Sequence, residues 1–322
     1  MVICQLCPKE CRIPSGGRGD CRIRVNLDGR LTALTYGFPC AVHVDPIEKK
    51  PLYHFLPGTP ILSLATVGCN LHCANCQNWT ISQADPENVE AVHLPPAAVV
   101  ALARSYSCPS VAFTYTEPLV FYEYTFDTFQ ALREAGVRTV LVTAGYLQQK
   151  PLRELYRLTD AANIDLKFMS DRLYREVCDA TLQPVLEGII LAKEMGVWVE
   201  VTNLVIPTLN DADRDFTEIA RWVARETGPD TPLHFSAFFP HYRMRNLPPT
   251  PAATLERAAA LARSEGLRYV YVGNVLSDTG QDTFCPKCGA RVVTRRRLSV
   301  VGCEIRNGCC THCDTAMAGI WN

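Results

Sequence analysis

Three cysteines stand close together in the segment ATVGCNLHCANCQNWTIS, which covers residues 65–82. Cys69, Cys73 and Cys76 are four and then three positions apart, and an apolar run precedes them. A structural zinc site takes four ligands, and a closed 4Fe-4S cluster takes four thiolates. Three local thiolates therefore leave one metal position open, which is what a catalytic metal needs. The alternative is a structural zinc ion whose fourth ligand lies elsewhere, for which His72 is a candidate.

Two further cysteine groups lie near the ends of the chain. The C-terminal group consists of two C-x-x-C pairs and predicts one four-thiolate site for zinc or an auxiliary iron–sulfur cluster: Cys285, Cys288, Cys310 and Cys313. The N-terminal group suits a further closed site, for zinc or iron–sulfur: Cys4, Cys7, Cys11 and Cys21. Disulfides are the alternative for this group, and a reducing cytosol disfavours them.

The remaining cysteines and one basic run receive plainer interpretations. Free cysteine is often a small buried hydrophobe, and we interpret three residues in this way: Cys40, Cys108 and Cys178. Cys303 and Cys309 lie nearby in the sequence, are not needed for the C-terminal site, and could replace one of its ligands. The run Arg295, Arg296, Arg297 is typical of a solvated face.

Composition places the chain among globular proteins. It has 322 residues and a formal net charge of −1, so no basic field favours nucleic acid. The N-terminal stretch has no apolar region of the kind found in secretory signals, and no apolar run approaches the ~18 residues of a membrane span. We therefore predict a cytoplasmic protein that does not interact with membranes.

Apolar, β-rich runs alternate with amphipathic segments through the middle of the chain. The predicted strands cover residues 61–67, 110–116, 138–144, 162–168, 197–206, 233–239 and 268–275. The predicted helices cover residues 95–106, 119–136, 151–159, 183–196, 211–228 and 250–266. This alternation predicts an α/β fold with a parallel sheet, arranged as a complete or partial TIM-like (βα) barrel. We divide the chain into a Cys-rich N-terminal extension (1–58), the barrel core (59–280) and a C-terminal Cys-rich knuckle (281–322).

The barrel predicts where the chemistry lies, because active sites of such barrels sit at the C-terminal ends of the strands. Cys69 comes two residues after the first predicted strand, so we expect the three cysteines at this mouth. Asp165 and Lys167 are two positions apart in the fourth predicted strand and point to one face. Two charged residues on one face of a buried strand are unusual unless they pair or bind a polar group. Thr202 lies on one face of the next predicted strand.

The motif C-x-x-x-C-x-x-C after a first barrel strand resembles the radical S-adenosylmethionine (SAM) superfamily. Three segments closely resemble the AmmeMemoRadiSam-system radical SAM enzymes, which are relatives of glycyl-radical-enzyme activases such as pyruvate formate-lyase activating enzyme. They are DPIEKKPLYHFLPG (45–58), SLATVGCNLHCANCQNWTIS (63–82) and the tail with CPKCGARVV, GCCTHC and AGIW. The resemblance implies a 4Fe-4S cluster whose open iron chelates SAM, and one-electron cleavage of SAM to a 5′-deoxyadenosyl radical that abstracts hydrogen from substrate.

The resemblance also implies a set of SAM contacts. Thr116 and Glu117, in TYTEP, correspond to the segment that meets the SAM ammonium group, whereas Glu before Pro is more often a turn residue. Asp165 and Lys167 correspond to residues that contact the ribose and carboxylate, with an internal ion pair as the alternative. The other expected contacts are Thr202, His241 and Trp79. Trp79 is expected to hold adenine because Asn75 replaces the aromatic residue that many members carry. The segment 142–145 departs from the activase cation site, so no such site is expected.

The leading hypothesis is therefore a radical SAM enzyme acting on a small molecule or peptide. An activase that installs a glycyl radical on a partner protein is one alternative, although activases lack the C-terminal pairs, which we expect to narrow the barrel mouth. A zinc-ribbon protein that binds nucleic acid or a partner is the other alternative. The resemblance further implies a one-electron reductase such as flavodoxin or ferredoxin, and a pathway shared with Memo-like and AMMECR-like proteins.

Overall fold

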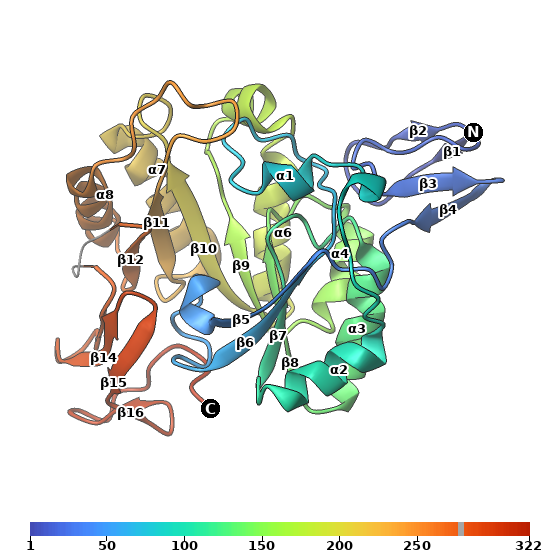
Figure 1. Cartoon of the computed structure of the whole chain (residues 1–322). Coiled ribbons are helices and arrows are strands. Elements are labelled where there is room, and N and C mark those ends of the chain that lie inside the picture. Colours follow the sequence, from blue (N-terminus) through green and yellow to red (C-terminus); the bar gives the residue numbers. More distant parts are fainter. Residues whose placement is uncertain (276–279) are drawn as a thin grey trace.

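The computed structural model describes residues 1–275 and 280–322, and its centre is one curved sheet of eight strands (Figure 1). Hydrogen bonds connect the strands in the order β12-β11-β10-β9-β8-β7-β6-β5. The parallel strands are β6 (Pro60–Ala65), β7 (Ser110–Phe113), β8 (Arg138–Thr143), β9 (Ala161–Asp165), β10 (Trp198–Val205), β11 (Leu233–Ala237) and β12 (Val270–Gly273). At one edge β5 (Ala41–Pro46) pairs antiparallel with β6, with Val42 opposite Leu64.

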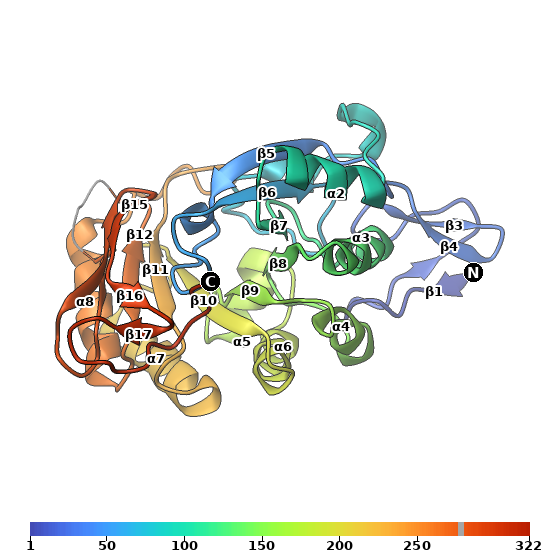
Figure 2. The same cartoon turned by 90° about the horizontal axis from the view of Figure 1, so that it is seen from below.

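Helices cover the outside of this sheet (Figure 2). The main helices are α2 (Pro96–Ser105), α3 (Tyr122–Glu134), α4 (Gln149–Tyr156), α6 (Gln183–Glu194), α7 (Asp213–Thr227) and α8 (Ala252–Ser264). In α7 the buried residues Phe216, Ile219, Ala220 and Val223 occupy positions i, i+3, i+4 and i+7, which forms one apolar stripe facing the strands. Shorter helical turns are α1 (Trp79–Ser82), α5 (Asp171–Leu173), η1 (Ile47–Lys49), η2 (Pro86–Asn88) and the π-helix η3 (Tyr174–Cys178).

The predicted α/β fold is confirmed, with all predicted parallel strands and main helices in place. In the described part of the chain β5 and β12 are unpaired edges, so the barrel is partial. The strand β5 was not predicted because His43 and Asp45 interrupt its apolar pattern and its side chains are mostly outside the core. It lies within segment 1–58, so the sheet begins inside the predicted N-terminal extension. The three-part division itself stays a prediction.

The end of the barrel where the parallel strands begin is closed by residues 47–58 and by the last residues of the chain. Phe55 and Leu56 pack with Ile61, Ala161 and other residues of the strands in a separate apolar cluster. Ile320 joins this cluster, and its backbone N–H donates to the carbonyl of His54 at 2.7 Å. The motif at 45–58 therefore closes the barrel at the end opposite the predicted mouth.

Glu200 attaches this closing segment to the sheet. Its buried carboxylate accepts hydrogen bonds from the backbone N–H groups of Tyr53 and His54 at 3.0 and 2.7 Å. It also contacts His234 Nε2 at 2.7 Å. Burial opposes the charge, but His234 and these donors outweigh it and lower the pKa of Glu200.

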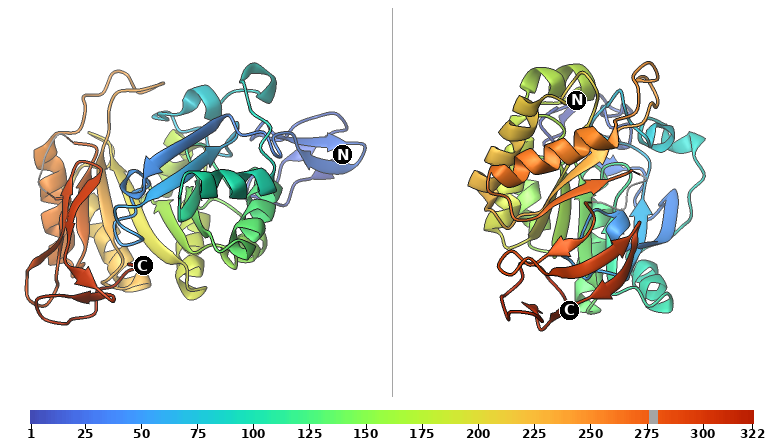
Figure 3. Two further views of the ribbon diagram at one scale, coloured as in Figure 1. Left: turned by 60° about the horizontal axis from the view of Figure 1, so that its bottom comes forward. Right: turned by 90° about the vertical axis from the view of Figure 1, so that its left-hand side faces the viewer.

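Small hairpins form the two ends of the chain. The N-terminal strands are β1 (Val2–Ile3), β2 (Arg12–Ile13), β3 (Arg24–Leu27) and β4 (Arg30–Ala33). The C-terminal strands are β13 (Thr283–Phe284), β14 (Arg291–Arg296), β15 (Ser299–Cys303), β16 (Ile305–Arg306) and β17 (Cys309–Cys310). The two Cys-rich ends lie on opposite sides of the barrel sheet (Figure 3).

Candidate functional site

The three central cysteines lie on the loop that follows β6, at the C-terminal edge of the parallel strands. The backbone N–H groups of His72 and Ala74 donate to the carbonyls of Cys178 and Val177, both at 2.8 Å. Ala74 in turn accepts from the N–H of Arg243 at 3.0 Å, from the loop after β11. Segments that follow two other strands, β9 and β11, therefore hold this loop.

The spacing of the three sulfurs distinguishes between the two metal hypotheses. Within residues 1–275 and 280–322, Cys69, Cys73 and Cys76 do not form a group whose ligand atoms all lie within 4.8 Å of one another. A tetrahedral zinc–thiolate site with Zn–S bonds of about 2.3 Å brings sulfurs to about 3.8 Å. In an iron–sulfur cluster the thiolates bind different irons and stand further apart. The three thiols fit a cluster better than a single ion.

His72 does not support the zinc alternative. Its Nδ1 contacts Gln83 Oε1 at 2.6 Å and its Nε2 contacts Asp20 Oδ2 at 2.8 Å. Both ring nitrogens are therefore already hydrogen-bonded to partners other than the three thiols. The hydrogen bond with Asp20 raises the pKa of His72, although burial opposes this shift.

Cys178 is buried, as we predicted, and it also lies beside the central cysteines. It ends the π-helix η3 and its thiol hydrogen-bonds to Cys73. This contact is the largest cause lowering the pKa of Cys73; burial opposes it and the nearby Lys167 ammonium assists it. A lone cysteine more than a hundred residues from the motif gave no sequence signal for this proximity.

The structure brings Asp165, Lys167 and Thr202 together beside the cysteines. Lys167 Nζ donates to Asp165 Oδ2 at 2.8 Å, and Asp165 lies opposite Thr202 in the register of β9 and β10. Burial would lower the pKa of Lys167, but Asp165 and the thiols of Cys73 and Cys178 outweigh it and raise the pKa. The predicted internal ion pair is therefore present, and it faces the cysteine loop.

Thr202 shows a further contact that the sequence did not predict. Its hydroxyl donates to Asn163 Oδ1 at 2.9 Å. Asn163 in turn donates to the carbonyl of Pro51 at 2.8 Å, so its side chain links β9 and β10 to the closing segment. Asn163 lies two positions before Asp165 and therefore on the same face of β9, and this alternation could have identified it as a residue of the site.

Thr116 and Glu117 follow β7 and are held by internal hydrogen bonds. The Thr116 hydroxyl donates to the carbonyl of Thr66 at 2.7 Å. Glu117 is buried, and its oxygens accept from the Thr143 hydroxyl and from the N–H groups of Ala144 at 2.8 Å and Leu119 at 3.2 Å. Burial raises the pKa of Glu117 to about 7 in spite of these donors. Its observed contacts fasten the ends of β7 and β8, and its contact with SAM stays a prediction.

Trp79 and His241 lie in loops that meet at the same mouth. The ring of Trp79 stacks on Tyr242, with centroids 5.0 Å apart and an interplanar angle of 13°. His241 precedes Tyr242 and forms a β-bridge with Met244, next to the contact between Arg243 and Ala74. Tyr242 was not predicted as a site residue, although its position beside His241 was the available signal.

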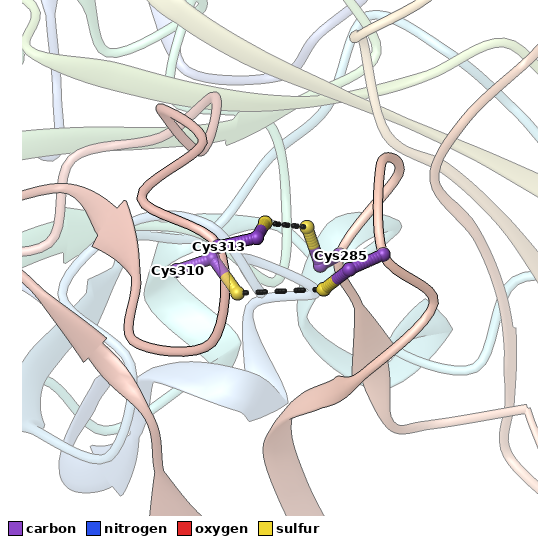
Figure 4. A group of neighbouring side chains, drawn as sticks. Cys285, Cys310 and Cys313 are labelled. Carbon is purple, nitrogen blue, oxygen red and sulfur yellow. Dashed lines mark hydrogen bonds between the residues drawn. The ribbon is translucent and has the colours of Figure 1, made fainter.

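The C-terminal cysteines form a compact four-thiol group (Figure 4). The sulfurs of Cys285 and Cys313 are 3.6 Å apart, and those of Cys288 and Cys310 are 3.8 Å apart. These distances match the about 3.8 Å of a tetrahedral tetrathiolate ion. Cys303 lies outside the group and is exposed.

The tail that carries this group packs at the closed end of the barrel, so the expectation that it narrows the mouth is wrong. Tyr53, Tyr269 and Tyr271 form an apolar cluster with residues of the tail. Tyr53 comes from the distant closing segment, whereas Tyr269 and Tyr271 lie at β12, shortly before the tail. No local sequence pattern indicated that these three rings would face the tail.

Arg295 is fully buried, so the prediction that its run is solvated is wrong at this position. Its guanidinium donates to the carbonyl of Tyr53 at 2.7 Å and lies 4.1 Å from the centroid of that ring. It also lies 3.7 Å from Glu48. Arg296 and Arg297 are exposed, as predicted.

The N-terminal cysteines surround a pocket beside the central loop. Its lining includes all of the predicted ligands: Cys4, Cys7, Cys11 and Cys21. Asn70, the residue after Cys69, also lines this pocket.

Comparison with known proteins identifies the family. Residues 63–223 match the model of the radical SAM superfamily. The chain belongs to the radical SAM superfamily. It is 46% identical, over 97% of its length and 93% of the relative, to an uncharacterized protein of Methanocaldococcus jannaschii. It is also 22% identical to the pyruvate formate-lyase 1-activating enzyme of Escherichia coli K12, over 63% of this chain and 89% of that enzyme.

Solved structures agree in fold. A radical SAM methyltransferase from Sphaerobacter thermophilus superposes with a TM-score of 0.54 at 16% identity, covering 69% of this chain and 68% of that chain. Streptococcus suis SuiB bound to S-adenosylmethionine gives a TM-score of 0.53 at 13% identity, covering 71% of this chain and 53% of that chain. These likenesses support the partial-barrel fold.

Membership of this superfamily makes the chain an enzyme and implies a 4Fe-4S cluster and SAM. The chain's residues fit such a cluster, because three thiols at the barrel mouth are too widely spaced for one ion. The relationship to activating enzymes also implies a reductant and a substrate. Among the described residues, no helix has the length and apolar character needed to span a bilayer.

Proposed function

We propose that this enzyme is of the AmmeMemoRadiSam type, and that Cys69, Cys73 and Cys76 hold the 4Fe-4S cluster with which it cleaves SAM reductively. When bound, the cluster supplies one electron that splits SAM into methionine and a 5′-deoxyadenosyl radical, which abstracts hydrogen from the substrate. The observation that supports this most directly is the wide spacing of the three thiols at the mouth. The resemblance of residues 45–58, 63–82 and the tail supports the subfamily.

Other side chains at the mouth would hold SAM. The Asp165–Lys167 pair presents one carboxylate and one ammonium group beside the cysteine loop, which suits ribose hydroxyls and the SAM carboxylate. The stacked pair of Trp79 and Tyr242 offers an aromatic surface for adenine. Thr116, Glu117, Thr202 and His241 complete the proposed contacts.

The proposed substrate is a small molecule or peptide. An activase function remains the second candidate, because the chain is 22% identical to an activating enzyme over 89% of that enzyme. Transfer of deuterium from a labelled substrate into 5′-deoxyadenosine would identify a small molecule or peptide. A stable glycyl radical on a partner protein, detected by electron paramagnetic resonance (EPR), would support the activase instead.

We further propose a cytoplasmic enzyme that receives electrons from a flavodoxin or ferredoxin and shares a pathway with Memo-like and AMMECR-like proteins. The C-terminal group is proposed to hold zinc, because its sulfur–sulfur distances of 3.6 and 3.8 Å fit a single ion. This ion would stabilise the closed end of the barrel. An auxiliary cluster there is the alternative, and iron and zinc counts separate the two.

The test of cluster binding is EPR of the anaerobically reconstituted, dithionite-reduced protein. We expect a cluster signal that changes shape when SAM is added, because SAM would bind at the open iron. The triple variant C69A/C73A/C76A should lose the SAM-dependent change. The exposed Cys303, outside all three groups, provides the control variant C303A, which should behave as the wild type. A SAM-dependent signal that persists in the triple variant would contradict the proposal.

A further inference from the structure

The N-terminal pocket has the features of a second buried metal centre. It is lined by four cysteines that come from one short stretch, and by the basic residues Lys9 and Arg24. Cys4, Cys7 and Cys21 are buried, and Cys11 is half-buried. The lining also includes Asp20, which pairs with Lys9 at 2.7 Å, while Arg24 pairs with Glu123 at 2.8 Å. The pocket thus places four thiols around one partly enclosed space, with the Arg24 guanidinium near Cys21.

Backbone donors are already directed at these sulfurs. The N–H of Asp20 donates to Cys11 Sγ at 3.4 Å. Backbone N–H groups of Lys9 and Ile23 hydrogen-bond to the thiols of Cys7 and Cys21. Hydrogen bonds to ligand sulfurs help to set the potential of an iron–sulfur cluster.

The spacing of the four sulfurs separates this pocket from the C-terminal group. Within residues 1–275 and 280–322, no three of them lie within 4.8 Å of one another. The C-terminal thiols meet that limit and fit one ion, whereas the N-terminal thiols share the wider spacing of the central loop. The geometry favours a cluster over zinc.

The pocket is packed directly against the central cysteine loop. Asn70 is buried, hydrogen-bonds to the Cys7 thiol and directly follows Cys69 in the chain. Its Oδ1 atom is buried without a hydrogen-bond partner. On the other side of Cys69, a Cβ added to Gly68 would lie 2.7 Å from the carbonyl oxygen of Cys21. The residues on both sides of Cys69 therefore touch the N-terminal cysteines.

A second connection runs through Lys9. Its Nζ pairs with Asp179 at 2.6 Å, and Asp179 follows Cys178, whose thiol contacts Cys73. The C-terminal group has no comparable position, because it packs at the closed end of the barrel. Of the two terminal cysteine groups, only the N-terminal one adjoins the mouth.

We propose that Cys4, Cys7, Cys11 and Cys21 hold a second iron–sulfur cluster that relays single electrons to the cluster on the central loop. A reduced flavodoxin- or ferredoxin-class donor gives one electron to the N-terminal cluster, which is reoxidised when it reduces the central cluster. The relay rests on the proposed function, whereas the metal site itself does not.

The metal site is tested by iron and acid-labile sulfide counts on the full-length, anaerobically reconstituted triple variant C69A/C73A/C76A. We expect about four irons per chain, as for one 4Fe-4S cluster. They should disappear when C7A and C21A are added, and remain when C303A is added instead. A triple variant with no iron, or with a second zinc in this pocket, would overturn the site. Circular dichroism verifies folding, and the C11S substitution, at the least buried ligand, is a milder second variant.

The relay is tested in a chain that retains Cys69, Cys73 and Cys76 but carries C7A and C21A. Cleavage of SAM driven by dithionite should persist, while cleavage driven by reduced flavodoxin should fall to background. Equal flavodoxin-driven rates in this variant and the wild type would overturn the relay. If the wild type cleaves no SAM with dithionite, the proposed function fails, and the iron count still decides the N-terminal site.

Discussion

At the residue scale, the side chains expected to contact SAM differ in their exposure to solvent and in the hydrogen bonds that they already make. Asp165, Lys167 and Trp79 are partly exposed beside the cysteine loop, whereas Glu117 is buried and hydrogen-bonded on both oxygens. Alternation along the predicted strand 162–168 placed Asp165 and Lys167 together. The structure joins them as an ion pair, although Lys167 lies beyond the last residue of β9. The contacts of Cys178 with Cys73 and of Asn70 with Cys7 depend on tertiary packing, so no local sequence pattern could predict them.

The Asp165→Asn substitution tests the proposed SAM contact. A lost hydrogen bond to a charged group costs about 1.5–3 kcal/mol, which corresponds to roughly tenfold or more in SAM affinity. Affinity is measured by equilibrium binding to the reconstituted protein. The control is Asp230→Asn, because Asp230 pairs with Arg268 on the surface. Unchanged affinity together with lower thermal stability would instead show a purely structural ion pair.

At the element scale, the parallel strands and main helices could be predicted because each has an apolar run or stripe of ordinary length. The short strand β5 could not be predicted, since His43 and Asp45 interrupt its apolar pattern. Lys167 lies just beyond β9, which ends at Asp165, in the loop that leads to α5. The position of the C-terminal hairpins was also unpredictable, because it depends on contacts with Tyr53, which is distant in the sequence, as well as with Tyr269 and Tyr271.

Loss of metal from the C-terminal group should release the tail. Structural zinc supplies on the order of 10 kcal/mol of folding free energy in small zinc domains. In the Cys288→Ala variant we expect residues 281–322 to become sensitive to protease while the barrel remains resistant. Cys303→Ala is the matched control. A tail that stays resistant and metal-free would show that the aromatic cluster and Arg295 hold it without metal.

The attachment of the tail should also depend on pH through His54. This buried ring contacts the carbonyl of Ala318 at 2.7 Å and the Tyr271 hydroxyl. Burial lowers its pKa to about 4, from an ordinary value of 6.5, despite the nearby Glu200. The unfolded chain therefore binds more protons between these values, so the stability is complete above pH 6.5 and falls as the pH decreases towards 4.

The loss amounts to about 3 kcal/mol for this group, from the difference between the two pKa values. Unfolding by denaturant at several pH values measures it. The His54→Gln variant should show a weaker dependence over this range, whereas His93→Gln, at an exposed histidine, should retain the slope of the wild type. Equal slopes in all three proteins would exclude His54 as the cause.

At the scale of the whole molecule, the barrel separates the two cysteine-rich ends of the chain (Figure 1). The N-terminal pocket adjoins the mouth through Gly68 and Asn70, and the C-terminal group closes the opposite end. The spacing of the cysteines in the sequence predicted the three groups, but the distances between their sulfurs are set by the fold and could not be predicted. Those distances favour clusters at the first two groups and one ion at the third.

The most direct test of the central claim is the yield of 5′-deoxyadenosine from SAM under anaerobic, dithionite-reducing conditions. The reconstituted wild type and the Cys303→Ala control should form it. The variant lacking Cys69, Cys73 and Cys76 should form none, because its remaining cysteines provide no cluster at the barrel mouth. Formation of 5′-deoxyadenosine at the wild-type rate by that triple variant would contradict the account.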